Sequence, residues 1–238
     1  MPGFIIAGMT KASSSSARKS VDHRTLVGAE RRERTRAKLL KGALRVFASH
    51  GVDAKVIDLI IREAGVARGT FYNYFSTNEE LFIEVAREVS NEIIRIVEPL
   101  VQQQQDPASR LACGVSSVIK LAIAYPVFAQ FVVRGGPQAL SAGNLASEVV
   151  PRDVKAGIST GRFDIADEKL AFDLILGPII MAFHTILSEK VSKHYPHLLA
   201  QAILQSLGVG KTLARKYAFQ DFGKAEISEE SLFAQTSG

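Results

Sequence analysis

The stretch AGVARGTFYNYF, Ala64 to Phe75, constrains the fold of this chain more than any other. Its glycine is expected to end a short apolar helix, because glycine readily adopts the left-handed conformation found just past helix ends. A second short helix is expected to begin at Ala67 or Arg68 and to end near Phe75. In it, Phe71 and Phe75 are four residues apart and therefore face the same side. The pattern predicts a helix–turn–helix whose second helix buries its phenylalanines.

The opposite side of that second helix carries Arg68, Gly69, Tyr72 and Asn73. The guanidinium fork of an arginine matches O6 and N7 of guanine. A glycine permits close approach of the backbone to another molecule. These side chains are candidates for contact with a DNA groove; the alternative is that they form an ordinary solvated helix face.

The residues ahead of this stretch are strongly basic. Eleven Lys or Arg and three acids lie between Lys11 and Arg45, an excess of eight in a chain whose net charge is +5. Such asymmetry favours a polyanionic partner for the N-terminal part, and the alternative is a solvated basic tail. A first helix is expected from Glu30 to Ser49, with Gly51 as its left-handed cap.

A larger helical body is expected to follow. Ser76 or Thr77 with Glu79 or Glu80 forms a capping box, which opens a helix ending near Pro99. Further helices are expected over residues 108–125, 126–134, 138–159, 167–191 and 195–216. The chain is thus predicted to be all-α, with four parts: a disordered basic tail (1–28), a helix–turn–helix domain (29–77), a helical ligand-binding and dimerisation domain (78–219) and a flexible tail (220–238).

Several classes of protein are not expected. The lone Cys113 excludes an intramolecular disulfide framework and a multi-cysteine zinc site. His194 and His197 lack an evident third ligand, so we expect no metal site and no cofactor. The sequence has no nucleophile elbow or phosphate loop, and no enzyme is expected. A signal peptide is not expected, and the apolar stretch 170–187 contains Asp173, Pro178 and His184, which favours a buried helix over a membrane span.

The stretch and its surroundings resemble the tetracycline-repressor (TetR/AcrR) family of bacterial regulators. The resemblance covers about fifty residues, Arg31 to Phe82, in which turn, aromatic and acidic elements keep the family's spacing. The matching segments are Phe47 with Gly51, Ala64-Gly65-Val66, Gly69-Thr70-Phe71-Tyr72-Asn73-Tyr74-Phe75 and Glu79-Glu80-Leu81-Phe82.

The resemblance implies a cytoplasmic, nucleoid-associated bacterial homodimer that binds a palindromic operator in double-stranded DNA. By position, Arg68, Gly69 and Tyr72 would lie nearest the bases, and Thr70, Asn73 and Tyr74 would hold phosphates. The chain departs from the family pattern at Lys55-Val56, Ile61, Ala67 and Asn78. Lys55 would replace the usual threonine contact with a charge, and Asn78 stands where a lysine commonly contacts phosphate.

The resemblance also implies that a small effector binds in the C-terminal body and releases the operator. Candidate pocket residues are Phe128, Phe131, Arg134, Asp173 and His184. Asp173 and His184 fall on roughly the same helix face and would pair, line the pocket or lie at a dimer seam formed by helices 167–191 and 195–216. A ligand-released repressor is the main interpretation; the alternatives are an activator, a ligand-independent DNA-binding protein and, more distantly, an enzyme.

Overall fold

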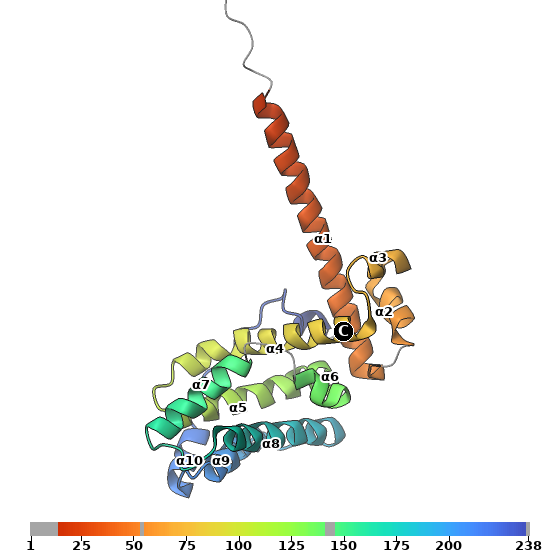
Figure 1. Cartoon of the computed structure of the whole chain (residues 1–238). Helices are drawn as coiled ribbons and strands as arrows, with labels where there is room; N and C mark the ends of the chain where they lie inside the picture. Colours follow the sequence, from red (N-terminus) through yellow and green to blue (C-terminus); the bar gives the residue numbers. More distant parts are fainter. Residues whose placement is uncertain (1–13, 53–54, 141–145, 237–238) are drawn as a thin grey trace, which may run out of the picture. The chain divides into compact units, whose positions relative to one another are not determined.

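The computed structural model describes residues 14–52, 55–140 and 146–236, and every regular element in these ranges is a helix. The all-α prediction is confirmed. The chain divides into two compact units, Met1–Lys38 and Leu39–Gly238, each of which is described by itself. The second unit contains the helix–turn–helix and the helical body (Figure 1).

Helix α1 runs from Ser14 to His50 and begins well before the expected Glu30. The helix thus includes residues 14–28 of the segment expected to be a disordered tail, and residues 1–13 lie outside the described part. Residues 29–41 are rich in Ala, Arg, Lys, Leu and Glu, which are good helix formers. Because a nucleated helix extends at little cost per residue, it continues toward the serine run. Gly51, at φ +77°, follows the helix and donates to Phe47 O, as predicted.

The turn follows the predicted chemistry. Helix α2 (Val56–Ala64) ends at Gly65, whose φ of 63° places it in the left-handed region. Helix α3 (Arg68–Tyr72) is shorter than expected and passes into a turn in which the Tyr74 and Phe75 amides donate to Phe71 O. Phe71 and Phe75 are both buried. Asp53, whose residue type favours a helix N-cap just before α2, lies outside the described residues.

Helix α1 passes very close to α2. A Cβ on Gly42 would lie 3.1 Å from Ala64 N, so the glycine admits the backbone of α2 at this point. The buried side chains Leu39, Ala43 and Phe47 complete this face of α1. The small core behind α3 therefore depends on both Gly42 and the apolar stripe of α1.

The capping box at the start of helix α4 (Asn78–Gln102) uses Thr77 and Glu80. Thr77 Oγ1 accepts from Glu80 N at 3.1 Å, and Glu80 Oε2 accepts from Ser76 N at 2.6 Å. The sequence predicts that this helix ends near Pro99, but the helix continues to Gln102, one turn further. The proline removes one amide donor, and the rest of the final turn retains helical geometry.

The body is a layered set of helices around α5 (Pro107–Ala124), which packs against α4 on one side and against α8 and α9 on the other (Figure 1). The remaining elements are α6 (Pro126–Gly135), η1 (Gly136–Leu140), α7 (Ala146–Ser159), α8 (Glu168–Ser188), α9 (Tyr195–Ser206) and α10 (Lys211–Ala218). The expected single helix 195–216 breaks at Gly208, whose φ is +85° and where a Cβ would lie 2.7 Å from Asp164 Cβ. The expected helix 138–159 is divided, and residues 141–145 lie outside the described part.

Cys113 is buried in α5 and forms no disulfide. Burial raises the pKa of its thiol to about 11, against the weaker opposing effects of Ser117 and Lys120. The side chain therefore stays neutral at physiological pH and behaves as a small apolar core residue.

The segment after α10 is not a loose tail, and the prediction of a flexible segment over residues 220–236 is wrong. Phe222 and Phe233 are buried, and a short 3-10 helix, η2 (Ala234–Thr236), follows. The ring of Phe233 lies 5.4 Å from that of Phe128 and 6.3 Å from that of Tyr125. We call residues 231–236 the C-terminal strap.

The C-terminal strap also reaches the helix–turn–helix. Gln235 O accepts from Arg45 Nη2 at 3.0 Å, and Arg45 Nη1 pairs with Glu63 of α2 at 3.0 Å. Arg45, one of the basic residues of the N-terminal stretch, therefore forms internal contacts that connect the C-terminal strap to α1 and α2.

Candidate nucleic-acid interface and ligand cavity

The outer side of α3 is exposed as the sequence predicts. Arg68, Gly69, Tyr72 and Asn73 are exposed, whereas Thr70 and Tyr74 are half-buried at its edges. The buried Phe71 lies behind this surface, with its ring 5.2 Å from that of Tyr72. We call Arg68, Gly69, Tyr72 and Asn73 the recognition surface.

Arg68 is held in place by a residue that the sequence did not single out. Its Nη1 lies 2.7 Å from Asp58 Oδ1 of α2, although both side chains are more than half exposed. The guanidinium is also 6.0 Å from the centre of the Tyr72 ring. An acid in the first turn of α2 was visible in the sequence, but its distance from Arg68 depends on how the turn folds. An exposed pair of this kind contributes little to stability, so Arg68 can exchange partners.

Two departures from the family pattern have different structural roles. Lys55 is exposed at the start of α2 and makes no side-chain cap there. Asn78 is buried, and its Nδ2 donates to Val52 O at 3.3 Å. Lys55 is therefore available to a ligand, whereas Asn78 connects the start of α4 to the segment before α2.

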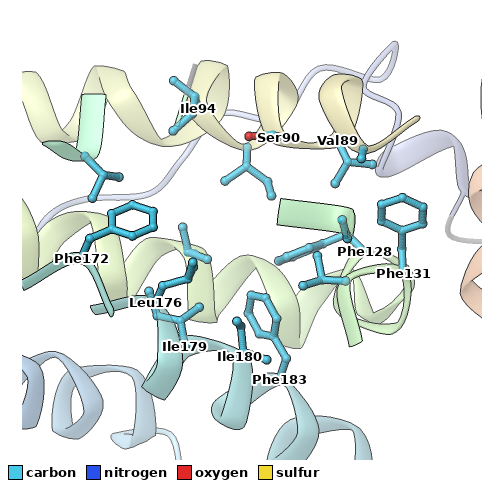
Figure 2. A pocket seen from close by; sticks show the side chains of 16 residues that line it. Val89, Ser90, Ile94, Phe128, Phe131, Phe172, Leu176, Ile179, Ile180 and Phe183 are labelled. Atoms are coloured by element: carbon cyan, nitrogen blue, oxygen red, sulfur yellow. The ribbon is translucent and has the colours of Figure 1, made fainter. Parts of the chain in front are cut away.

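An apolar cavity of about 180 Å³ lies within the body, lined by side chains from α4 to α8 (Figure 2). It includes both predicted phenylalanines, Phe128 and Phe131, together with Phe172 and Phe183. Of the 16 lining side chains, Ser90 carries an oxygen and the others are hydrocarbons. The structure thus brings together an aromatic chamber with one hydroxyl group.

The three polar pocket candidates do not line this cavity. Arg134, Asp173 and His184 are exposed. The reason is helical phase: on α8 the cavity is lined by residues 172, 176, 179, 180 and 183, and Asp173 and His184 are each one residue away from that face. Arg134, in the last turn of α6, likewise extends to the surface. These three residues therefore lie outside the lining of this cavity, and for Asp173 and His184 the alternatives of a pair or a dimer seam stay open.

Most of the cavity-lining residues that the sequence did not predict lie on α4 and α8. The apolar periodicity of both helices was visible, but both faces of α8 are apolar, so the sequence alone does not indicate which face meets the cavity. Ser90 had no distinguishing pattern around it.

The outward face of α8 is also apolar. Leu170 and Met181 are 51% and 63% exposed, and Asp173, Gly177 and His184 share their face. Leu198 of the following α9 is 49% exposed. We call Leu170, Gly177, Met181 and Leu198 the outer stripe; exposed apolar side chains repeated along one helix face, such as Leu170 and Met181, favour an interaction surface.

By length and composition alone, the described helices α5 and α8 are each apolar enough to cross a membrane. This is weak evidence, because core helices of folded proteins pass the same test. Within the described ranges, no group of three or more His, Cys, Asp or Glu is arranged to hold a metal ion. The rings of His194 and His197 both lie near Phe219.

An aromatic chain connects the cavity with α1. The ring of Phe131, in the cavity wall, lies 5.0 Å from that of Phe82 of α4. Phe82 in turn meets Phe47 of α1 edge-on at 5.2 Å. Phe131 is therefore linked through two ring contacts to α1, the helix on which α2 and α3 pack.

Family models match two parts of the chain. One described as "Bacterial regulatory proteins, tetR family" matches residues 39–85, and one described as "Tetracyclin repressor-like, C-terminal domain" matches residues 106–219. Together they cover the helix–turn–helix and the greater part of the helical body.

Curated relatives match over about a quarter to a third of the chain. The HTH-type transcriptional repressor AcnR of Corynebacterium diphtheriae is 34% identical over 62 residues, which cover 26% of this chain and 33% of AcnR. The fatty acid metabolism regulator protein of Bacillus subtilis is 28% identical over 83 residues, 35% of this chain and 43% of that protein. The chain thus spans well under half the length of these relatives.

Solved structures match over more of the chain. The structure of RolR in complex with resorcinol is 29% identical, with a TM-score of 0.66, and the match covers 82% of this chain and 98% of RolR. FadR from Bacillus subtilis in complex with stearoyl-CoA is 22% identical, with a TM-score of 0.57, over 73% of this chain and 97% of FadR. At that identity the second likeness shows the fold alone.

Proposed function

Because this chain belongs to the tetR family of bacterial regulatory proteins, we propose that it is a homodimeric transcriptional repressor released from a palindromic operator by a small molecule. The observation that carries the proposal is the recognition surface, four exposed residues backed by the buried Phe71 and Phe75. In this arrangement one side of α3 anchors the helix, and the other is free to enter a major groove. The protein would act in the cytoplasm, at the bacterial nucleoid.

Arg68 and Tyr72 are proposed to face the bases, and Lys55, Thr70, Asn73 and Tyr74 to hold phosphates. Gly69 lies between the two base-reading residues, and nothing within 4 Å would meet a Cβ there, so DNA can approach the backbone. Base contacts set sequence preference, whereas phosphate contacts fix register. A dimer would place two such helices in successive major grooves, about 34–36 Å apart.

Replacing Arg68 by Ala is expected to weaken operator binding about 5- to 150-fold, because a good bidentate contact to a base contributes about 1–3 kcal/mol. Tyr72→Ala should also weaken binding. The operator is first selected from a random DNA library with the wild-type protein, and affinities are then measured by gel shift at several salt concentrations. Unchanged binding in both variants would contradict the assignment of α3 as the reading helix.

The matched variant Asp58→Asn tests the same contact from the other side. It removes the acid that pairs with Arg68 at 2.7 Å and so leaves the guanidinium available to DNA. We expect binding of non-specific DNA to become tighter, and Asp58→Asn combined with Arg68→Ala to lose that gain. A gain that survives in the double variant would mean that Asp58 acts on the DNA without involving Arg68.

The basic N-terminal residues are proposed to add sequence-independent attraction to phosphates. The described side chains Arg31, Arg32 and Arg34 are exposed, and Glu33 pairs with Arg36 at 3.7 Å. Deleting residues 1–28 removes four further basic residues, Lys11, Arg18, Lys19 and Arg24, and should flatten the dependence of log K on log salt, since each phosphate contact contributes about −0.9 to that slope. Fluorescence anisotropy over a salt series measures it. An unaltered slope would identify the segment as inert.

The apolar cavity is proposed to hold the effector. RolR, which was crystallised with resorcinol, supports a small molecule in a body of this fold. An effector would act by favouring one position of Phe131 and, through Phe82 and Phe47, one orientation of the reading helices. The coupling between effector and DNA in such systems is typically about 1–3 kcal/mol. An activator would instead bind its DNA more tightly with effector. Titrating the effector into the complex of protein and operator distinguishes the two cases.

A further inference from the structure

We infer that the effector is a compact, uncharged molecule built on a single hydrocarbon ring, with one hydroxyl-type group that meets Ser90. This rests on the proposed function, because it names the chemical class that the cavity of the proposed repressor accepts. The inference follows from the polarity of the cavity wall, its size and the charges next to it.

The wall offers hydrogen bonding at one side chain. Ser90 lies one turn after Ala86 on α4, and both side chains line the cavity (Figure 2). A serine hydroxyl both donates and accepts, so it can pair with one ligand hydroxyl. A second polar group on the ligand would face hydrocarbon side chains and lose its hydration without compensation.

The four phenylalanines favour a ring. Phe128 and Phe183 meet edge-on at 5.2 Å, the geometry that aromatic rings adopt with one another. The volume of about 180 Å³ is close to that of an apolar protein cavity of about 150 Å³ that binds benzene. One ring with a short substituent fits this space.

Charged ligands are disfavoured by the surroundings. A second cavity of about 100 Å³ shares Ile94, Val118, Val150 and Ile179 with the first, and its wall includes Arg110 and Asp153. These two are already paired at 2.9 Å.

The charges beside that pair are also matched. Arg152 bonds both Asp153 and Glu98 at 2.9 Å, and these carboxylates raise the pKa of Arg152. The charges of two cations and two anions therefore balance, and no net charge is left for an ionised ligand.

The test uses three molecules of one shape: p-cresol, which has a hydroxyl; toluene, which has none; and p-toluate, which is anionic. Each is titrated into the full chain by calorimetry, and into its operator complex by anisotropy. We expect p-cresol to bind and to release DNA, toluene to bind about 3- to 10-fold more weakly, and p-toluate to bind at least about 100-fold more weakly.

Ser90→Ala is expected to bind toluene more tightly than p-cresol, because the p-cresol hydroxyl then has no partner, whereas the matched Ser188→Ala, exposed at the end of α8, keeps the preference for p-cresol. Ser90→Leu fills the cavity and should abolish binding of all three; its thermal unfolding confirms that it folds. Tighter binding of p-toluate or of octadecanoate would overturn the inference, as would a p-cresol preference that survives Ser90→Ala. If p-toluate or octadecanoate released the DNA, the proposed repressor function would still hold. A chain that binds p-cresol but selects no DNA would contradict the proposed function alone.

Discussion

Met181→Arg is expected to convert a dimer into monomers and to lower operator affinity about 10²- to 10⁴-fold. Met181 is 63% exposed at the centre of the outer stripe on α8. In a two-fold dimer the same patch faces its own copy, so the substitution introduces two like charges into one apolar interface. A monomer engages only one half-site, and the gain from linking two binding modules, about 10²–10⁴, is lost.

Analytical ultracentrifugation and anisotropy on the selected operator measure the two effects together. The matched control is Ile83→Arg, which adds the same charge at another exposed apolar residue, 52% exposed, on α4. We expect that variant to remain dimeric. A dimeric Met181→Arg with full affinity would show that dimerisation uses another face; loss of dimerisation in both variants would point to a nonspecific effect of the charge.

Phe233→Ala is expected to lower the free energy of unfolding by about 3–5 kcal/mol, the usual cost of removing a buried phenylalanine side chain. Phe233 is fully buried in the C-terminal strap, next to Phe128 and Tyr125. Its removal would open space behind the cavity wall. The loss corresponds to a fall in Tm of about 6–20 °C for a domain of this size.

Urea denaturation at a fixed protomer concentration checks this, since dimerisation adds to stability by mass action. Phe219→Ala is the matched control, because Phe219 is 38% exposed. We expect a smaller loss there, confined to its contacts with His194, His197 and Arg215. Equal losses in the two variants would mean that the C-terminal strap contributes no more than a surface aromatic.

The helix–turn–helix was predictable because its signals are local. The left-handed Gly65 and the four-residue spacing of Phe71 and Phe75 each act within one turn of helix. The exposure of Arg68 and Tyr72 follows from the same spacing. Asp58 was missed because its contact with Arg68 crosses the turn.

The body was harder to predict because its elements are defined by distant partners. Helix α8 lines the cavity with one face and presents the outer stripe on another, so no polar side distinguishes inside from outside. For this reason the sequence could not decide whether Asp173 and His184 line the cavity or lie on the outward face, where the structure places them. Likewise, Phe233 looks like an isolated aromatic in a polar segment, and its burial depends on Phe128, more than one hundred residues earlier.

The contact between Arg45 and the C-terminal strap joins residues 190 apart in the chain. During translation, Arg45 and its partner Glu63 are made early, whereas Gln235 follows only after 190 more residues, about 10–40 s at a rate of about 5–20 residues per second. For that interval the nascent DNA-binding domain folds without this support. Closing so large a loop is also slow, because the chain loses loop-closure entropy before the long-range contact stabilises the fold. Ribosome-bound chains halted before residue 231 should therefore contain a less protected helix–turn–helix than released chains.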